Sequence, residues 1–457
     1  MFCLQKLKKA EYIFLLLASI FGIILIAVIP PLGGADEVFH YQRIASIANG
    51  QILNKEVAVP GGIVDFIKFG YDYTTSLKNP PYNYNAELWQ KFADIKLQTQ
   101  EPKNLTPNYF TVHNPIAYIP QATVFAIGES FNFSPLSLMY MARIAGFIAS
   151  VVITFYAVRI IPSQKYLLAA LALLPNIALC RSLVITDTFT NALAFLLVAL
   201  INREIFTQGV INKRNLLLIA ITGFLLAQAK IPYLFLEFLM LAIPTARFSS
   251  LKHKIITITA IILPSIIATL AYVVLIKSTS FQGLEYHTWG GDADPDSQIA
   301  FILANPLQFT GILFNTIFNT NFAASFFEIF RSVGPGNPLS VGQMLPIFYL
   351  LCGVVACDKS GGNLRHNRFT KIIVISIIVA FIVTSLTLLY VHWTGVASTV
   401  IIGFMGRYLN PILPLLLIFV RPLSRKTPEN SVIFATYITA ILSFVFSVTT
   451  VYANYYG

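Results

Sequence analysis

The chain has 457 residues, of which 56% are hydrophobic and only 11% charged, and its mean hydropathy is +0.71. Because soluble domains carry about 25% charged residues, this composition excludes an ordinary soluble protein and indicates an integral membrane protein. The net charge of +11 does not indicate nucleic-acid binding, since the cytoplasmic loops of multi-pass proteins collect Lys and Arg.

The N-terminus carries a short basic segment with Lys6, Lys8 and Lys9, followed by an apolar run that ends near Pro30. This run is too long for the apolar region of a signal peptide, and no small-residue cleavage site closes it. We therefore expect an uncleaved first span with a cytoplasmic N-terminus.

The segment 33–112 is the large polar part of the chain and is rich in Tyr, Asn, Pro and Lys. It has short amphipathic pieces near 36–49 and 85–97, but too little apolar periodicity to bury a core of its own. We expect it to be the first extracytoplasmic loop and to lie across the face of the membrane bundle.

Ten further apolar runs follow, and basic clusters separate them. The runs lie at approximately 136–160, 166–183, 185–202, 215–230, 231–246, 255–276, 342–357, 372–391, 408–420 and 431–452. The later clusters are Arg159 and Lys165; Arg203, Lys213 and Arg214; Arg247, Lys252 and Lys254; Lys359, Arg365, Arg368 and Lys371; and Arg421, Arg425 and Lys426. All clusters fall on one side of the membrane, as the positive-inside rule requires, if 115–130 and 300–335 do not cross fully.

The sequence thus predicts one all-α polytopic domain over residues 1–457, with about eleven spans, or up to thirteen if both exceptional segments cross. The segment 300–335 is broken at Asn305-Pro306 and belongs to a second extracytoplasmic or re-entrant region, 277–341. We expect the protein in the cell membrane, with its C-terminus outside.

This topology places the unusual polar side chains on the outer side, so we expect an extracytoplasmic active site. They are Asp36, Glu37, His40, Arg43, His113, Asp187, Lys230, Glu285, His287, Asp292, Asp294, His392 and Arg407. Ionisable residues at membrane depth are costly and are candidates for function.

Asp36 and Glu37 begin a predicted helix in "PPLGGADEVFHYQRIASIANG", where Asp36, His40 and Arg43 share one face. Asp36 could simply cap this helix, and Glu37 could simply favour its dipole. Alternatively, one of the two carboxylates is a general base whose pKa rises near apolar lipid. His40 could orient that carboxylate or help to bind a metal, although an isolated Asp-x-x-x-His is weak evidence for a metal site.

Arg407, in "GFMGRYLNPILPLL", lies at the outer end of an apolar run. A guanidinium there suits the phosphate of a lipid carrier, but it could also extend to the headgroups without any such role. Lys230 has the same two interpretations. Asp187 could cap its helix, act as a second carboxylate or bind a sugar, and His113 in "HNPIAYIP" would lie beside the first loop.

Several stretches together resemble one family. "PPLGGADEVFHYQR", "HNPIAYIP", "MARIAGFIASVVITFYAVRIIP", "ALLPNIALCRSLVITDTFTNALAF" and "GFMGRYLNPILPLL" follow in the order seen in domain of unknown function 2142, over residues 10–420. That family is similar to the GT-C glycosyltransferases, which use sugars linked to polyprenyl phosphate. Met405 stands where the family usually has Gln before Gly-Arg-Tyr.

The resemblance implies a site. An acidic residue of the first outer loop, here Asp36 or Glu37, would be the catalytic base. Arg407, and less directly Lys230, would hold the lipid phosphate. The remaining substrate-binding candidates are His40, Arg43, His113, Asp187, His392 and Tyr408.

The expected function is inverting transfer of a sugar from a polyprenyl-phosphate-linked donor to an extracytoplasmic glycan, lipid or protein. No cofactor is required, although a divalent metal (Mg or Mn) would be compatible, and the other partners are membrane lipids. Two alternatives stay open. A transporter or flippase of lipid-linked saccharides would need polar residues at mid-depth. A polymerase or ligase working with Arg and His would not need Asp36 or Glu37.

Overall fold

The apolar runs form helices, because each backbone N–H and C=O in hydrocarbon needs a partner within its own segment. The computed structural model describes residues 6–53, 55–76, 80–98, 101–107, 113–280, 287–288, 291–331, 337–362, 364–420 and 428–457. Over these residues the protein is an all-α helix bundle with two small two-stranded sheets, as the sequence predicts. Glu285, Arg421, Arg425, Lys426 and the side chains of His287 and Asp292 lie outside what the structure describes.

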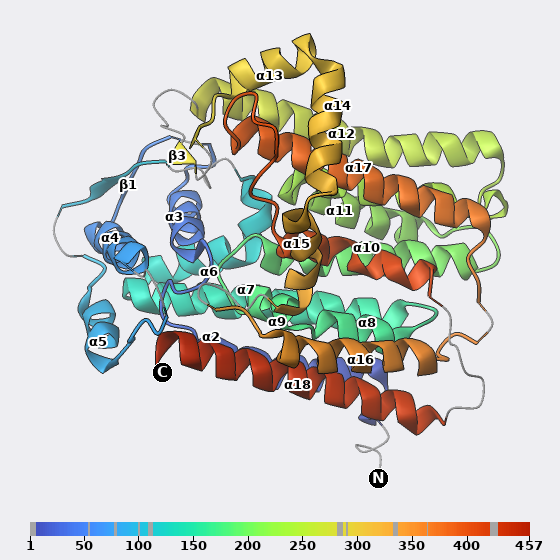
Figure 1. The fold of residues 1–457 in the computed structure, drawn as a ribbon, viewed down its shortest axis with the longest axis horizontal. Coiled ribbons are helices and arrows are strands. Elements are labelled where there is room, and N and C mark those ends of the chain that lie inside the picture. The colour runs from blue at the N-terminus through green and yellow to red at the C-terminus, as the bar shows by residue number, and fades with distance from the viewer. Residues whose placement is uncertain are drawn as a thin grey trace.

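The longer helices run side by side along the molecule (Figure 1). They are α2 (Ala10–Val28), α7 (Pro135–Ile160), α10 (Asp187–Phe206), α11 (Lys213–Ala229), α12 (Leu251–Ser280), α16 (Val341–Cys357), α17 (Arg368–His392) and α18 (Glu429–Tyr455). Within the described residues, six helices are long and apolar enough to cross a membrane, or seven if one bent pair counts as a span.

The other predicted spans are occupied by shorter or broken helices. The run 166–183 is divided into α8 (Lys165–Ala172) and α9 (Pro175–Arg181), and the run 408–420 forms the 3₁₀ helix η5 (Gly406–Ile418). Proline explains the break in the first run and the 3₁₀ helix in the second. It has no backbone N–H to donate within an α-helix, and its ring clashes with the preceding turn. Pro175 therefore begins a new helix, while Pro411 and Pro414 lie inside η5. A second 3₁₀ helix, η3 (Ile231–Ala242), follows α11.

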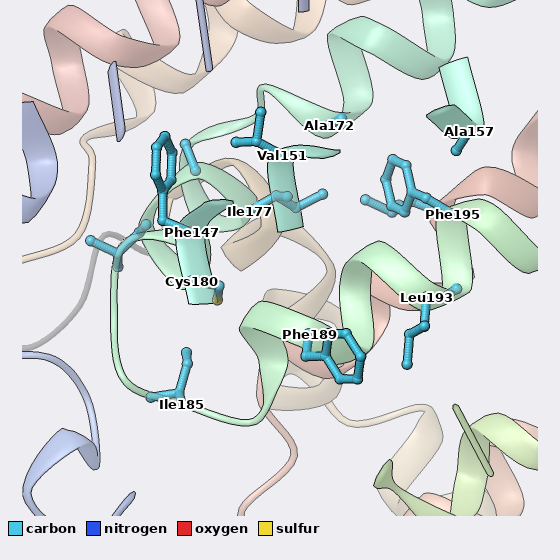
Figure 2. Close-up of a cluster of buried hydrophobic side chains, with 14 of the residues drawn as sticks. Phe147, Val151, Ala157, Ala172, Ile177, Cys180, Ile185, Phe189, Leu193 and Phe195 are labelled. Atoms are coloured by element: carbon cyan, nitrogen blue, oxygen red, sulfur yellow. The ribbon is translucent and has the colours of Figure 1, made fainter. Parts of the chain in front are cut away.

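The core lies around α10, most of which is buried. Figure 2 shows apolar side chains of α7, α9 and α10 packed together, including Phe147, Ile177 and Leu193. Between membrane helices such contacts stabilise the bundle through close van der Waals packing, because the lipid tails are as apolar as the side chains. This packing fixes the start of α10, where Asp187 lies.

The first loop forms three helices and two short strands at one end of the bundle, beside the C-terminus (Figure 1). They are α3 (Glu37–Ala48), α4 (Gly61–Ser76), α5 (Ala86–Asp94) and an antiparallel pair of β1 (Val57–Val59) with β2 (Lys103–Leu105). The N–H groups of Tyr82 and Tyr84 donate to the carbonyls of Asn454 and Tyr455, both at 2.7 Å. Backbone hydrogen bonds thus join this loop to the end of α18.

The two segments expected not to cross fully are short helices. Residues 115–130 form η2 (Pro115–Tyr118) and the 12-residue α6 (Ile119–Ser130). The second region contains the antiparallel strands β3 (His287–Thr288) and β4 (Gly291–Asp292), followed by α13 (Pro295–Ala304), α14 (Pro306–Ile317) and α15 (Thr320–Arg331). The chain bends by 108° between α13 and α14. The predicted break at Asn305-Pro306 is therefore confirmed.

Candidate functional site

The site begins at Asp36, immediately before α3. Its backbone is left-handed (φ +60°), and its side chain does not cap the helix. Asp tolerates this conformation better than most residues because its side chain is short and polar. The carboxylate instead accepts a hydrogen bond from Arg407 of η5, which is 371 positions further along the chain.

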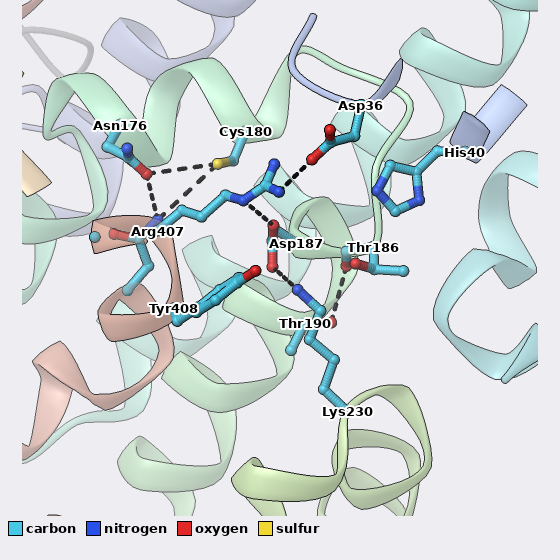
Figure 3. Close-up of polar contacts among 12 residues, drawn as sticks. Asp36, His40, Asn176, Cys180, Thr186, Asp187, Thr190, Lys230, Arg407 and Tyr408 are labelled. Carbon is cyan, nitrogen blue, oxygen red and sulfur yellow. Dashed lines mark hydrogen bonds and ion pairs between the residues drawn. The ribbon is translucent and has the colours of Figure 1, made fainter. Parts of the chain in front are cut away.

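Four alternating charges continue from this contact, and we call them the charge chain: Asp36, Arg407, Asp187 and Lys230 (Figure 3). Arg407 Nε lies 3.8 Å from Asp187 Oδ2, and Lys230 Nζ donates to Asp187 Oδ1 at 2.5 Å. The Asp187 side chain is only 1% exposed, against 11% for Arg407 and 29% for Asp36. The charge chain has no formal net charge, and its Asp36 end is the most accessible.

Tyr408 supports both cations of the charge chain. Lys230 Nζ lies 5.4 Å and Arg407 Cζ 5.8 Å from the centre of its ring, so both can make cation–π contacts. Its carbonyl accepts a hydrogen bond from the Tyr233 hydroxyl at 3.0 Å. The Tyr408 ring thus contacts both Lys230 and Arg407, whose positive charges are separated by the Asp187 carboxylate.

Several buried polar side chains lie beside Arg407. Asn410 Nδ2 donates to Asn176 Oδ1 at 2.7 Å, and the Cys180 thiol lies 3.6 Å from the same oxygen (Figure 3). Nearby, the Gly406 N–H donates to Glu328 Oε2 at 2.6 Å. These residues were not among those predicted from the sequence. The signal available was an amide side chain within an apolar run, which is costly unless it is hydrogen-bonded.

Glu37 is held away from the charge chain. It and Arg143 of α7 form an ion pair in which both side chains are fully buried, with Arg143 Nη2 2.6 Å from Glu37 Oε2. Its carboxylate accepts four hydrogen bonds: two from Arg143 and two from the backbone N–H groups of Gly34 and Val184. Arg143 also donates to the carbonyls of Ile26, Ile29 and Pro30. The pair braces the turn between α2 and α3.

His40 and His113 form a stacked pair beside the charge chain. Their ring centres are 5.8 Å apart with planes 17° from parallel, and His40 Nδ1 lies 2.5 Å from the Tyr118 hydroxyl oxygen. Burial lowers the pKa of His40 well below its usual value, with further lowering by His113, Arg407 and Lys230. Burial and the charge of Lys230 lower the pKa of His113 to about 3. Both rings are therefore neutral near pH 7.

Arg43 and His392 have other positions. The Arg43 guanidinium donates to backbone carbonyls, with Nη2 2.8 Å from Ile52 O and 3.0 Å from His113 O. It therefore holds the backbone at Ile52 close to the backbone at His113. His392 is the last residue of α17 and is half-buried, but it is not part of the charge chain.

The sequence allowed for a divalent metal, but the described residues do not form a set of metal ligands. Within the described ranges, no three His, Cys, Asp or Glu side chains converge on one point. The two carboxylates of the charge chain are already engaged by cations. The arrangement can neutralise an anion and can accept a proton.

Comparison with known proteins identifies one family. The family model described as "Predicted membrane protein (DUF2142)" matches residues 17–416. This range includes every residue of the charge chain, the histidine pair and the Glu37–Arg143 brace. No curated protein matches the chain.

Proposed function

The chain belongs to the DUF2142 family of predicted membrane proteins, and we propose that it is a membrane glycosyltransferase. It would move a sugar from a polyprenyl-phosphate-linked donor to an extracytoplasmic glycan, lipid or protein, with inversion. One observation carries the proposal: Asp36 and Arg407, far apart in sequence, form an ion pair in one partly open cluster. A carboxylate base and a phosphate-binding cation thus lie together.

Asp36, rather than Glu37, is assigned as the base. The Asp36 side chain is the most exposed member of the charge chain, and it forms an ion pair with Arg407. Glu37 is fully buried and receives four donors, which fill the acceptor positions of a carboxylate. A group with neither space nor lone pairs for an acceptor hydroxyl is a poor base.

Arg407 and Lys230 are assigned to the donor phosphate. A guanidinium binds phosphate oxygens through two parallel hydrogen bonds, and a nearby ammonium adds a second charge. The phosphate competes with Asp36 and Asp187 for these cations. As Arg407 turns towards the phosphate, the Asp36 carboxylate is released from its ion pair and can accept the proton of the acceptor hydroxyl. Donor binding therefore prepares the base.

The reaction needs one base and a cation clamp. Asp36 takes the proton from the acceptor hydroxyl, and the oxygen forms a bond to the anomeric carbon. The bond between that carbon and the phosphate oxygen breaks, and its electron pair leaves with the phosphate held by Arg407 and Lys230. Charge that develops on the leaving oxygen meets cations already in place, which is the form of stabilisation that contributes most in enzymes.

The test compares two aspartates of the same loop. Asp36→Asn and Asp65→Asn are expressed in a strain lacking the gene, and surface glycans are analysed by mass spectrometry. Asp65 pairs with Lys103 at 2.6 Å at the surface, so it controls for loss of a loop carboxylate. We expect glycan modification to be lost only with Asp36→Asn, at equal protein levels. Full modification by that variant would overturn the base and favour the Arg-and-His ligase alternative.

A second variant tests the phosphate clamp independently. Arg407→Ala should abolish modification and also binding of undecaprenyl phosphate to the protein in nanodiscs, measured by calorimetry. Undecaprenol, which has the same chain without a phosphate, is the matched ligand. Equal binding of undecaprenyl phosphate and undecaprenol by the wild type would contradict the assignment of Arg407 and Lys230 to the phosphate.

A further inference from the structure

The histidine pair lies next to the turn that carries Asp36. His40 is one helical turn after Asp36, and its N–H donates to the Asp36 carbonyl at 3.1 Å. Figure 3 shows the His40 ring on the same side of Arg407 and Asp187 as Asp36 and Thr186. His113 stacks on His40 from a different segment, so two imidazoles are available at one position.

The surroundings of the pair are strongly charged, and the two cations of the charge chain are part of them. Among the described residues, the groups that act on the two rings include each ring on the other, Arg43, Asp187, Lys230, Arg407 and the Tyr118 hydroxyl. Tyr272 approaches the same place, because its hydroxyl donates to the His113 carbonyl at 3.2 Å. Arg407 and Lys230 both oppose a positive charge on either ring.

Resting on the proposed function, we propose that the His40–His113 pair receives and holds the proton that Asp36 removes from the acceptor. It does so only while a lipid phosphate occupies Arg407 and Lys230. Asp36 is the catalytic residue in this scheme, and the histidines act through it.

The proton moves in three steps. The acceptor O–H bond breaks and Asp36 becomes a neutral carboxylic acid. Its proton then passes to an imidazole nitrogen of the pair, which gives one imidazolium and restores the carboxylate. The imidazolium loses the proton to water when the lipid phosphate leaves.

Electrostatics make this uptake depend on the phosphate. In the resting state Arg407 and Lys230 disfavour a cation on either ring, and so does burial. A phosphate that carries up to two negative charges compensates these cations, so that one imidazolium becomes tolerable. A second proton is disfavoured because the rings are stacked 5.8 Å apart, where like charges repel. The pair therefore holds a single proton.

The experiment measures proton uptake on binding of the product lipid. Full-length protein in nanodiscs is titrated with undecaprenyl phosphate at pH 6 in two buffers of different ionisation enthalpy, and undecaprenol is the control ligand. Calorimetry then gives the protons bound per lipid. The variants are His40→Gln and His113→Gln, with His253→Gln as the matched control. His253 is exposed on α12 and lies 2.8 Å from Ser249 Oγ.

We expect the wild type and His253→Gln to take up more protons per phosphate bound than either pair variant, by up to about one proton. The ionisation of the lipid phosphate itself is common to all variants and cancels in the difference. Affinity should also rise as pH falls from 8 to 6 in the wild type by up to about tenfold more than in His113→Gln, since one pKa unit is tenfold.

Each outcome has a distinct meaning. Equal proton uptake by all variants, with normal lipid binding, overturns the histidine proposal and leaves the glycosyltransferase proposal standing. Absence of phosphate-dependent binding in the wild type overturns both. Because a variant could misfold, ¹⁵N-histidine NMR of the wild type gives a second reading. Imidazolium signals should appear with undecaprenyl phosphate and not with undecaprenol, and their absence also overturns the histidine proposal.

Discussion

Replacing Glu37 by Gln should destabilise the protein strongly, because Glu37 is a structural brace. Gln keeps the size of the side chain but removes the charge. Its NH₂ group would also face a donor where a carboxylate oxygen now accepts two hydrogen bonds. Arg143 would be left as a fully buried cation with carbonyls as its remaining partners. Removing one partner of a buried ion pair costs about 3–5 kcal/mol.

The measurement is chemical unfolding of purified protein in mixed micelles, followed by circular dichroism. Glu87→Gln is the control, because Glu87 also pairs with a cation, Lys91 at 2.8 Å, but on the surface. We expect an unchanged midpoint for Glu87→Gln and a much lower one for Glu37→Gln. If Glu37→Gln unfolds like the wild type and yet has no transfer activity, Glu37 is the base, and the reasoning that separates the two acids is refuted.

Three further substitutions test the remaining contacts. Arg407→Lys keeps the charge but loses the fork, so we expect a loss of about 1.5–3 kcal/mol, or roughly 10- to 150-fold in transfer rate; an unchanged rate would contradict bidentate binding. Asp187→Asn removes an acid that competes for both cations, and calorimetry should show tighter binding of undecaprenyl phosphate, whereas weaker binding would refute this competition. Gly62→Ala would bring a Cβ within 1.8 Å of the Lys96 carbonyl and should cost about 1–3 kcal/mol in unfolding experiments; Gly353→Ala, in open space, should leave the midpoint close to that of the wild type.

The helices could be predicted from sequence because apolar runs of this length have few alternatives in a membrane. Local signals also sufficed at Asn305-Pro306, where the chain bends by 108°. Continuity along each run was less predictable. Prolines at 411 and 414 lie inside a run that is apolar apart from Asn410, and composition alone does not distinguish a 3₁₀ segment from a full α-helical span.

The site could be predicted only in part, for a related reason. Asp36 and Arg407 each attracted notice as ionisable residues beside apolar runs, but the partner of Glu37 did not. Arg143 lies 106 positions away, within a long apolar helix. Such a pairing depends on how α2, α3 and α7 pack, and no spacing rule along the chain contains that information. Arg43 was predicted to bind substrate, but its guanidinium donates to backbone carbonyls of loops, and the sequence gives no sign of these partners.

The contrast between two adjacent acids connects the fold to the proposed chemistry. The backbone at Asp36 is left-handed, and its carboxylate contacts Arg407 of η5. Glu37, the next residue, begins α3, and its carboxylate contacts Arg143 of α7. The brace at Glu37 thus fixes the turn from which Asp36 extends, so loss of either acid would lower activity. Only activity per folded molecule separates the two roles: it should stay near wild type for the Glu37→Gln protein that does fold, and fall to background for Asp36→Asn.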